Sequence, residues 1–199
     1  MQADPGVNDA LVAYLTTRRT VPAPQLTAPG PDRATLDAML TIAARVPDHG
    51  KLAPWRFVLF DHERRQAGIP RLMDFATLPD DEAEERKRRQ RVEVFAVAPI
   101  VVGVLSSPVE HPKIPLWEQQ LSAAAVCFNL VHAAHAYGFS AQWLTDWFTY
   151  DGRAARFLGA RNAERFAGFV HIGTPALPPV ERDRPDVAAI TTVWREPAG

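Results

Sequence analysis

The sequence predicts an α+β fold or a three-layer α/β arrangement, and three observations lead to that prediction. Continuous apolar runs rich in β-branched residues at 100–105 and 165–172 are typical of buried strands. Stretches with helical spacing separate them, without a strict strand–helix–strand repeat. The chain has 199 residues, of which 47% are hydrophobic, so it can bury a core without disulfides or metals. We therefore expect one domain over residues 1–199, with an extended tail from about 176 to 199.

The N-terminal half contains two expected helices, one expected strand and a third, charged helix. Asn8 is a suitable N-cap for a helix that ends near 17–19, and a proline-rich loop follows over 21–31. Asp32 is expected to cap the second helix, which Pro47 ends. Residues 55–60 alternate as a strand, with Trp55 on its apolar face. Residues 82–94 form a charged helix whose basic run is flanked by acids, which favours a solvated face.

The C-terminal half contains the longest helical pattern of the chain. Residues 117–137 are apolar around most of the helix circumference, and Gly138 follows as a C-cap, so this helix is expected in a core or an interface. Short strands are expected at 100–105, 140–145 and 165–172, and a helix at 153–158. A Gly-Thr-Pro turn is expected after Ile172. Val193 and Trp194 are candidates for a final short strand.

Absent motifs exclude several common classes of enzyme. The chain has no G-x-G-x-x-G, Walker A, H-E-x-x-H or G-x-S-x-G motif. Its formal net charge of −1 argues against non-specific nucleic-acid binding. The longest apolar stretch, 96–105, is half a membrane span, and the polar, acidic start predicts no secretory signal. The one cysteine, Cys127, excludes an intrachain disulfide. We expect a cytoplasmic protein that does not contact membranes.

Three residues of the central helix invite a metal or nucleophile interpretation. His132 and His135 are three apart and can share a face, but the only acid on the helix, Glu118, is almost four turns away. We therefore expect histidines satisfied in the interior or an interface, and no metal site. Cys127 lies among apolar residues, without the electropositive surroundings that a reactive thiolate needs, and is expected to be a core residue.

The sharpest local feature is the triplet Arg18-Arg19-Thr20 at the end of the first helix. Two guanidiniums and a hydroxyl would form a compact phosphate clamp, although the triplet on its own favours a basic turn that interacts with the helix dipole. Four further segments follow it in order: Arg45-Val-Pro-Asp-His49-Gly-Lys-Leu-Ala-Pro54-Trp55, Trp117-Glu118-Gln119-Gln120, Gly138-Phe139-Ser140 with Trp143-Leu144-Thr145, and Ile172-Gly173-Thr174-Pro175. In this order the sequence resembles the nitroreductase family of FMN-dependent oxidoreductases. It is most similar to the small branch with an R-x-PDH…PW motif, from about Asn8 to Trp194.

The resemblance implies an α+β, nitroreductase-like three-layer fold, with a central, mostly antiparallel sheet between helices. It implies a homodimer with two FMN sites, each built from both chains. Residues that match the family's cofactor contacts fall in three groups. They are Arg18, Arg19 and Thr20 at the phosphate and ribityl chain, Arg45 and His49 at the flavin of the partner subunit, and Trp143, Leu144 and Thr145 against the same cofactor.

The implied chemistry is a ping-pong hydride transfer. Hydride passes from NADH or NADPH to flavin N5, and then to a nitroaromatic, quinone or similar small-molecule acceptor, so no side-chain nucleophile is expected. No Rossmann residue distinguishes NADH from NADPH. Some relatives perform dehydrogenation, dehalogenation or flavin fragmentation, usually with an extra lid over the flavin. The segment 80–91 is the only candidate for such a lid in this chain, and it is short. A non-enzymatic flavin-binding dimer, acting as a sensor, store or carrier, is the remaining alternative.

The sequence departs from the family pattern at three places. Many relatives have N-x-Q-P-W where this chain has Lys51 and Ala53 in place of the two amides. Many place a lysine or arginine where this chain has Pro22, which leaves Arg45 as a candidate for the charge near the flavin pyrimidine. Larger members use basic tail residues for the phosphate; Arg182 and Arg184 are the candidates here, although a solvated tail is the expectation.

Overall fold

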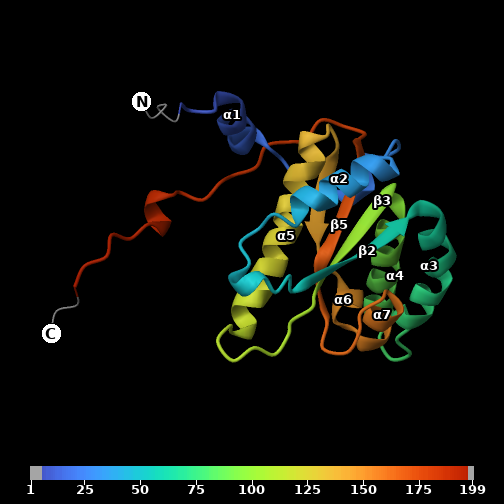
Figure 1. Ribbon diagram of the computed structural model, residues 1–199. Helices are drawn as coiled ribbons and strands as arrows, with labels where there is room; N and C mark the ends of the chain where they lie inside the picture. Colours follow the sequence, from blue (N-terminus) through green and yellow to red (C-terminus); the bar gives the residue numbers. More distant parts are fainter. Residues whose placement is uncertain (1–5, 197–199) are drawn as a thin grey trace. The chain divides into compact units, whose positions relative to one another are not determined.

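A five-stranded antiparallel sheet forms the centre of the larger of two compact units, residues 20–177, in the computed structural model (Figure 1). The structure describes residues 6–196. The strands are β1 (Leu26–Thr27), β2 (Trp55–Asp61), β3 (Ile100–Ser106), β4 (Ser140–Leu144) and β5 (Arg165–Pro175). Every strand pairing is antiparallel. The expected α+β class with a central antiparallel sheet is therefore confirmed.

Strand β5 organises the sheet, because β3, β4 and β1 all pair with it. β3 pairs along 165–172, β4 pairs along 169–173, and β1 pairs with Thr174 and Pro175. The predicted strand at 165–172 is thus correct but too short. The expected Gly-Thr-Pro turn is wrong, because β1 and β4 provide backbone partners that extend the strand through Pro175.

Helices α2 (Arg33–Ala43) and α5 (Leu116–Ala136) cover one face of the sheet, with a buried cluster between them and the strands (Figure 1). Asp32 caps α2 as predicted, since its carboxylate accepts a hydrogen bond from the Thr35 N–H at 2.8 Å. Gly138 follows α5 with a φ of 81°, the left-handed conformation that ends helices. Both helices were predicted within a few residues of their bounds.

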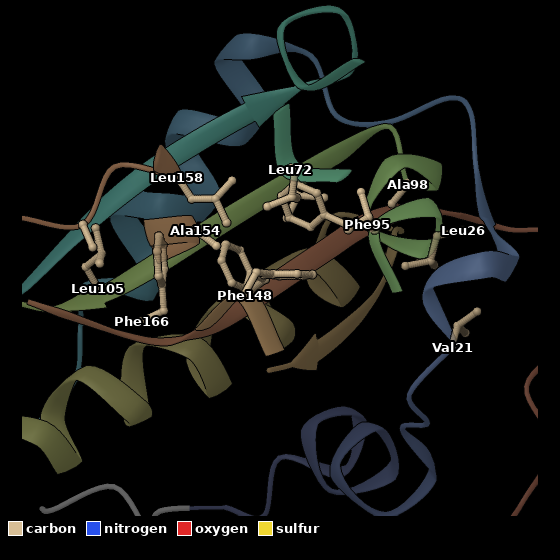
Figure 2. Close-up of a cluster of buried hydrophobic side chains, with 14 residues drawn as sticks. Val21, Leu26, Leu72, Phe95, Ala98, Leu105, Phe148, Ala154, Leu158 and Phe166 are labelled. Atoms are coloured by element: carbon tan, nitrogen blue, oxygen red, sulfur yellow. The ribbon is translucent and has the colours of Figure 1, made fainter. Parts of the chain in front are cut away.

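Four helices cover the opposite face: α3 (His62–Ala76), α4 (Glu82–Val97), α6 (Trp147–Tyr150) and α7 (Gly152–Phe157). Figure 2 shows the buried cluster beneath them, which includes Phe95 and Phe148 from two helices and Phe166 from β5. The Phe95 ring meets the Phe148 ring edge-on at 5.2 Å between centroids. Helix–sheet–helix layering confirms the three-layer expectation. Neither α3 nor α6 was predicted, and α4 extends past its predicted end.

The proline-rich segment that follows Arg19 carries more structure than the loop predicted for 21–31. It contains a 3₁₀ turn, Ala23–Gln25, and strand β1. Val21, Ala23 and Leu26 are fully buried. Gln142 Oε1 of β4 accepts a hydrogen bond from the Ala23 N–H at 2.6 Å, which ties this segment to the sheet.

The smaller unit comprises residues 1–19 and 178–199, of which the structure describes 6–19 and 178–196. It contains α1 (Asp9–Thr17), which Asn8 caps through the Leu11 N–H at 3.1 Å, as predicted. The tail contains one 3₁₀ turn, Ala188–Ile190. The short strand suggested at Val193 and Trp194 is wrong, because neither residue belongs to a strand. None of the helices within residues 6–196 has the length and apolar character of a membrane span.

Candidate functional site

The loop between α2 and β2 is attached to α5 at successive points along that helix. Asn129 Nδ2 donates to the carbonyl of Arg45 at 3.3 Å, as well as to that of Ile42 in α2 at 2.6 Å, and Ser122 Oγ donates to the carbonyl of Pro47 at 2.8 Å. Farther toward the start of α5, Glu118 Oε2 lies 2.7 Å from Nδ1 of His49. The segment that carries Arg45 and His49 is therefore fixed by three side chains of one helix.

Within this loop, the Asp48 side chain holds the backbone through two hydrogen bonds. Its carboxylate accepts hydrogen bonds from the N–H groups of Leu52 at 3.2 Å and Ala53 at 2.8 Å. Gly50, Lys51 and Ala53 adopt left-handed φ values of 74°, 56° and 45°. A Cβ at Gly50 would lie 2.5 Å from Ile114 Cδ1, which together with the positive φ favours glycine at this position. The loop thus has a defined conformation that includes two strained non-glycine residues.

Positive charge gathers on the exposed side of this loop. Arg45, His49 and Lys51 are all exposed. Neither Arg45 nor Lys51 forms an ion pair with another residue in 6–196, and the Asp48 carboxylate is occupied by backbone N–H groups. The loop therefore offers two cations to an anionic ligand.

The second predicted segment lies at the end of β4. Trp143 is 39% exposed, and its Nε1 donates to the carbonyl of Ala167 at 3.1 Å. A Cβ at Gly168 would lie 2.2 Å from that nitrogen, so glycine makes room for the indole. Thr145 is exposed, and its Oγ1 is 3.2 Å from the Tyr150 hydroxyl. Leu144 is half-buried. Within the described chain, no hydrogen bond joins this segment to the α2–β2 loop.

Arg18 and Arg19 lie in the smaller unit, and Thr20 is the first, exposed residue of the larger one. Arg19 donates through Nε and Nη2 to the carbonyl of Val180 at 2.9 and 2.7 Å, and its Nε lies 3.4 Å from Glu181. Glu181 also lies 3.3 Å from Arg184. The Arg182 N–H, followed by the charges of Arg19 and Arg184, lowers the pKa of the Glu181 carboxyl. Sequence reasoning missed this contact between the first helix and the tail.

Sequence reasoning also missed the partner of His49. Glu118 belongs to the Trp117-Glu118-Gln119-Gln120 segment and was considered only as a distant acid for the two helix histidines. The signal was present, because that segment and the Arg45–Trp55 segment both belong to the ordered set of motifs. What the sequence did not contain was their distance in space, which follows from packing of the α2–β2 loop on α5.

His132 and His135 contact groups of α5 itself, and Cys127 lies in the core. His135 Nδ1 lies 2.8 Å from the carbonyl of Val131, and the His132 ring packs edge-on against Phe128 at 4.3 Å. Residues 6–196 contain no cluster of three or more side chains arranged to hold a metal ion. Cys127 is fully buried, and burial raises the pKa of its thiol.

Comparison with known proteins places the chain in a family. The model of the nitroreductase family matches residues 15–174. A protein of Haemophilus influenzae named "Putative NAD(P)H nitroreductase" is 34% identical over 167 residues, which cover 83% of this chain and 88% of that protein. The chain belongs to the nitroreductase family.

Solved structures agree at the level of the fold. A nitroreductase-like family protein of Bacillus cereus superimposes with a TM-score of 0.79 at 19% identity, over 96% of this chain and 99% of that one. A nitroreductase of Bacteroides fragilis with bound FMN gives 0.72 at 19% identity, over 95% and 100%. An iodotyrosine deiodinase bound to FMN and 3-iodo-L-tyrosine gives 0.62 at 18% identity, over 88% and 95%.

Proposed function

We propose that this protein is an FMN-dependent oxidoreductase that takes electrons from NADH or NADPH and passes them to a nitroaromatic, a quinone or a similar acceptor. The observation that carries the proposal is the family match over residues 15–174. The relative in Haemophilus influenzae is named for NAD(P)H nitroreductase activity, and the similar fold in Bacteroides fragilis holds FMN. Hydride acceptance at the isoalloxazine ring is the chemistry that bound FMN would supply.

The residues present fit FMN by their chemistry. FMN combines a phosphate dianion with a large, flat, apolar ring, so its site needs cations at one end and an aromatic or apolar wall at the other. Arg18, Arg19 and the Thr20 hydroxyl are the proposed phosphate group, as guanidiniums match phosphate oxygens bidentately. Trp143, Leu144 and Thr145 are the proposed wall beside the ring. Arg45 and His49 are the proposed contacts from the other subunit.

We further propose that the working form is a homodimer whose FMN sites are shared. An exposed apolar stripe on α5 supports this. Trp117, Leu121 and Phe128 are spaced to share one side of the helix, and they are 66%, 49% and 48% exposed. A ping-pong mechanism follows if donor and acceptor occupy the same place beside the flavin in turn. The chain's residues then bind, orient and exclude water, and none acts as a nucleophile.

The cofactor is tested by spectrum and by removal of the phosphate group. Purified protein is expected to be yellow, and Arg18→Ala combined with Arg19→Ala is expected to weaken FMN binding on the order of a hundred-fold or more. Each charge-assisted contact contributes about 1.5–3 kcal/mol. Retained FMN is measured by absorbance after dialysis. Arg86→Ala with Lys87→Ala is the matched control, because it removes two exposed cations from α4.

If the Arg18 and Arg19 double variant remains fully yellow after dialysis, the phosphate is held elsewhere, and Arg182 and Arg184 become the next pair to replace. If wild-type protein purified from flavin-rich cells, and then incubated with FMN, binds none, the proposed function is wrong. Steady-state NADPH oxidation with a quinone acceptor separates the enzyme from a flavin store or carrier, because a carrier turns over no acceptor.

The shared site is tested by complementation. One variant carries Arg18→Ala and Arg19→Ala, and the other carries Arg45→Ala and His49→Ala. Each homodimer should contain two defective sites, whereas the mixed dimer should regain one intact site and about half of the wild-type activity per dimer. Activity is measured on heterodimers confirmed by mass. No recovery above the two parents would mean that both pairs act within one chain.

A further inference from the structure

The contact between His49 and Glu118 joins two elements that are far apart in sequence. His49 lies on the α2–β2 loop, Glu118 lies in the first turn of α5, and His49 Nδ1 is 2.7 Å from Glu118 Oε2. Both side chains are open to solvent, at 60% and 45% exposure. The pair is therefore accessible to a small molecule.

Stability does not explain why the loop presents this pair. An exposed ion pair adds little to the stability of a fold. Left-handed backbone at a non-glycine residue is unfavourable, and this loop contains two such residues, Lys51 and Ala53. Strain that a fold maintains in this way is typical of functional sites.

The geometry leaves one imidazole nitrogen available. Glu118 occupies the Nδ1 side, whereas Nε2 has no hydrogen-bond partner among residues 6–196. A carboxylate on one nitrogen fixes the orientation of the ring and accepts the Nδ1–H, so that the other nitrogen exchanges the proton. The other charged residues of this loop are Arg45, Asp48 and Lys51, and Lys113 precedes Ile114, which packs on Gly50.

We propose that His49 donates a proton to the acceptor, and that Glu118 is its positioning residue. This inference rests on the proposed function. Reduction of a quinone adds one hydride and one proton. As hydride adds to the acceptor, an electron pair moves onto a carbonyl oxygen, which forms an O–H bond with the proton from Nε2. The N–H bond breaks, its electron pair stays on nitrogen, and the imidazole regains a proton from water. The acceptor class is therefore one with an oxygen that must be protonated, such as a quinone or a nitro group.

The test compares an acceptor that needs a proton with one that does not. Ferricyanide takes single electrons and no protons, whereas a benzoquinone takes both. For His49→Gln, the ratio of quinone turnover to ferricyanide turnover, each per bound flavin, is expected to fall on the order of a hundred-fold. For Glu118→Gln the same ratio is expected to fall about ten-fold. His62→Gln, at an exposed histidine of α3, is the matched control with no expected change.

Two further measurements separate the possible failures. The hydrogen-bonded Nδ1 proton of His49, observed by NMR on the whole protein, should disappear or shift in Glu118→Gln. The solvent deuterium isotope effect on quinone reduction should change in His49→Gln. An unchanged turnover ratio in His49→Gln with normal flavin content overturns the proton-donor role and leaves the proposed function standing. Wild-type protein that reduces neither acceptor overturns the proposed function itself.

Discussion

Lys51 and Ala53 are non-glycine residues with a backbone φ that favours glycine. Both replace amide residues of the N-x-Q-P-W pattern, and both have positive φ values, 56° and 45°. Asparagine is among the non-glycine residues that tolerate this region best. Lysine at position 51 therefore bears a strain that asparagine would reduce.

Relief of that strain should be measurable. Ala53→Gly is expected to stabilise the protein by about 0.5–1 kcal/mol, because glycine adopts a positive φ without the steric penalty that alanine carries. Ala44→Gly is the matched control: Ala44 ends α2 with an ordinary φ of −72°, and its replacement should lower the stability slightly. Urea midpoints with unchanged slopes would measure both effects. A destabilised Ala53→Gly variant would contradict the strain.

At the scale of elements, the sequence predicted those whose apolar spacing is regular and missed those built differently. α2, α5 and β3 carry clear patterns and end at recognisable caps. α3 contains Gly68 and Pro70, and it buries an arginine, Arg65, at 3% exposure. The Arg65 guanidinium donates to the carbonyls of Phe60, Ala96 and Ala98. No periodicity of apolar residues reveals a helix held by such contacts, and α6 is too short to form a pattern.

For the candidate site, the sequence likewise indicates some residues but not the partners that they contact. Arg45, His49 and the Trp143–Thr145 segment are proposed from motifs, because their residue types and order are local properties of the sequence. The partners of Arg19 and His49 were not found. Those partners, Val180 and Glu118, lie far along the chain, and only the folded backbone brings them within hydrogen-bond distance.

Gly68 offers a prediction for α3. Its φ is not in the left-handed region, and a Cβ there would lie 3.5 Å from Phe157 Cζ, an ordinary contact. Gly68→Ala is therefore expected to stabilise the protein by about 1 kcal/mol, as glycine is a poor residue in a helix interior. Gly103→Ala is the contrast, because its Cβ would lie 2.7 Å from Phe166 Cε1, and it should destabilise by about 1–3 kcal/mol. Thermal unfolding of both variants checks the pair.

At the scale of the whole molecule, His171 on the central strand β5 makes the stability of the fold depend on pH in acid. It is fully buried on β5, and neither ring nitrogen has a hydrogen-bond partner within residues 6–196. Burial, followed by the charges of Arg65 and Arg91, lowers the pKa of His171 to about 3. The unfolded chain binds a proton near pH 6.5, so the stability that neutral His171 allows is complete above that pH. It is lost as the pH falls from about 6.5 toward 3.

His171→Leu should flatten this dependence. Wild-type protein is expected to lose on the order of 3 kcal/mol through this group between pH 6.5 and pH 4, and the variant none of it. Urea unfolding at both pH values, at one protein concentration, gives the difference between the two proteins. The carboxylates contribute equally to the pH dependence of both proteins, so their effect cancels in the difference. Equal pH slopes for the variant and wild type would show that His171 is already protonated in the folded protein.

The burial of Cys127 has a practical consequence for the study of assembly. Because the only thiol of the chain is buried in α5, with its pKa raised by that burial, it is closed to maleimides and other thiol reagents in the folded protein. A cysteine placed at exposed Glu63 on α3 would then accept a single dye on an otherwise native background. A pair of such chains would carry one dye each, and energy transfer between them would report association directly.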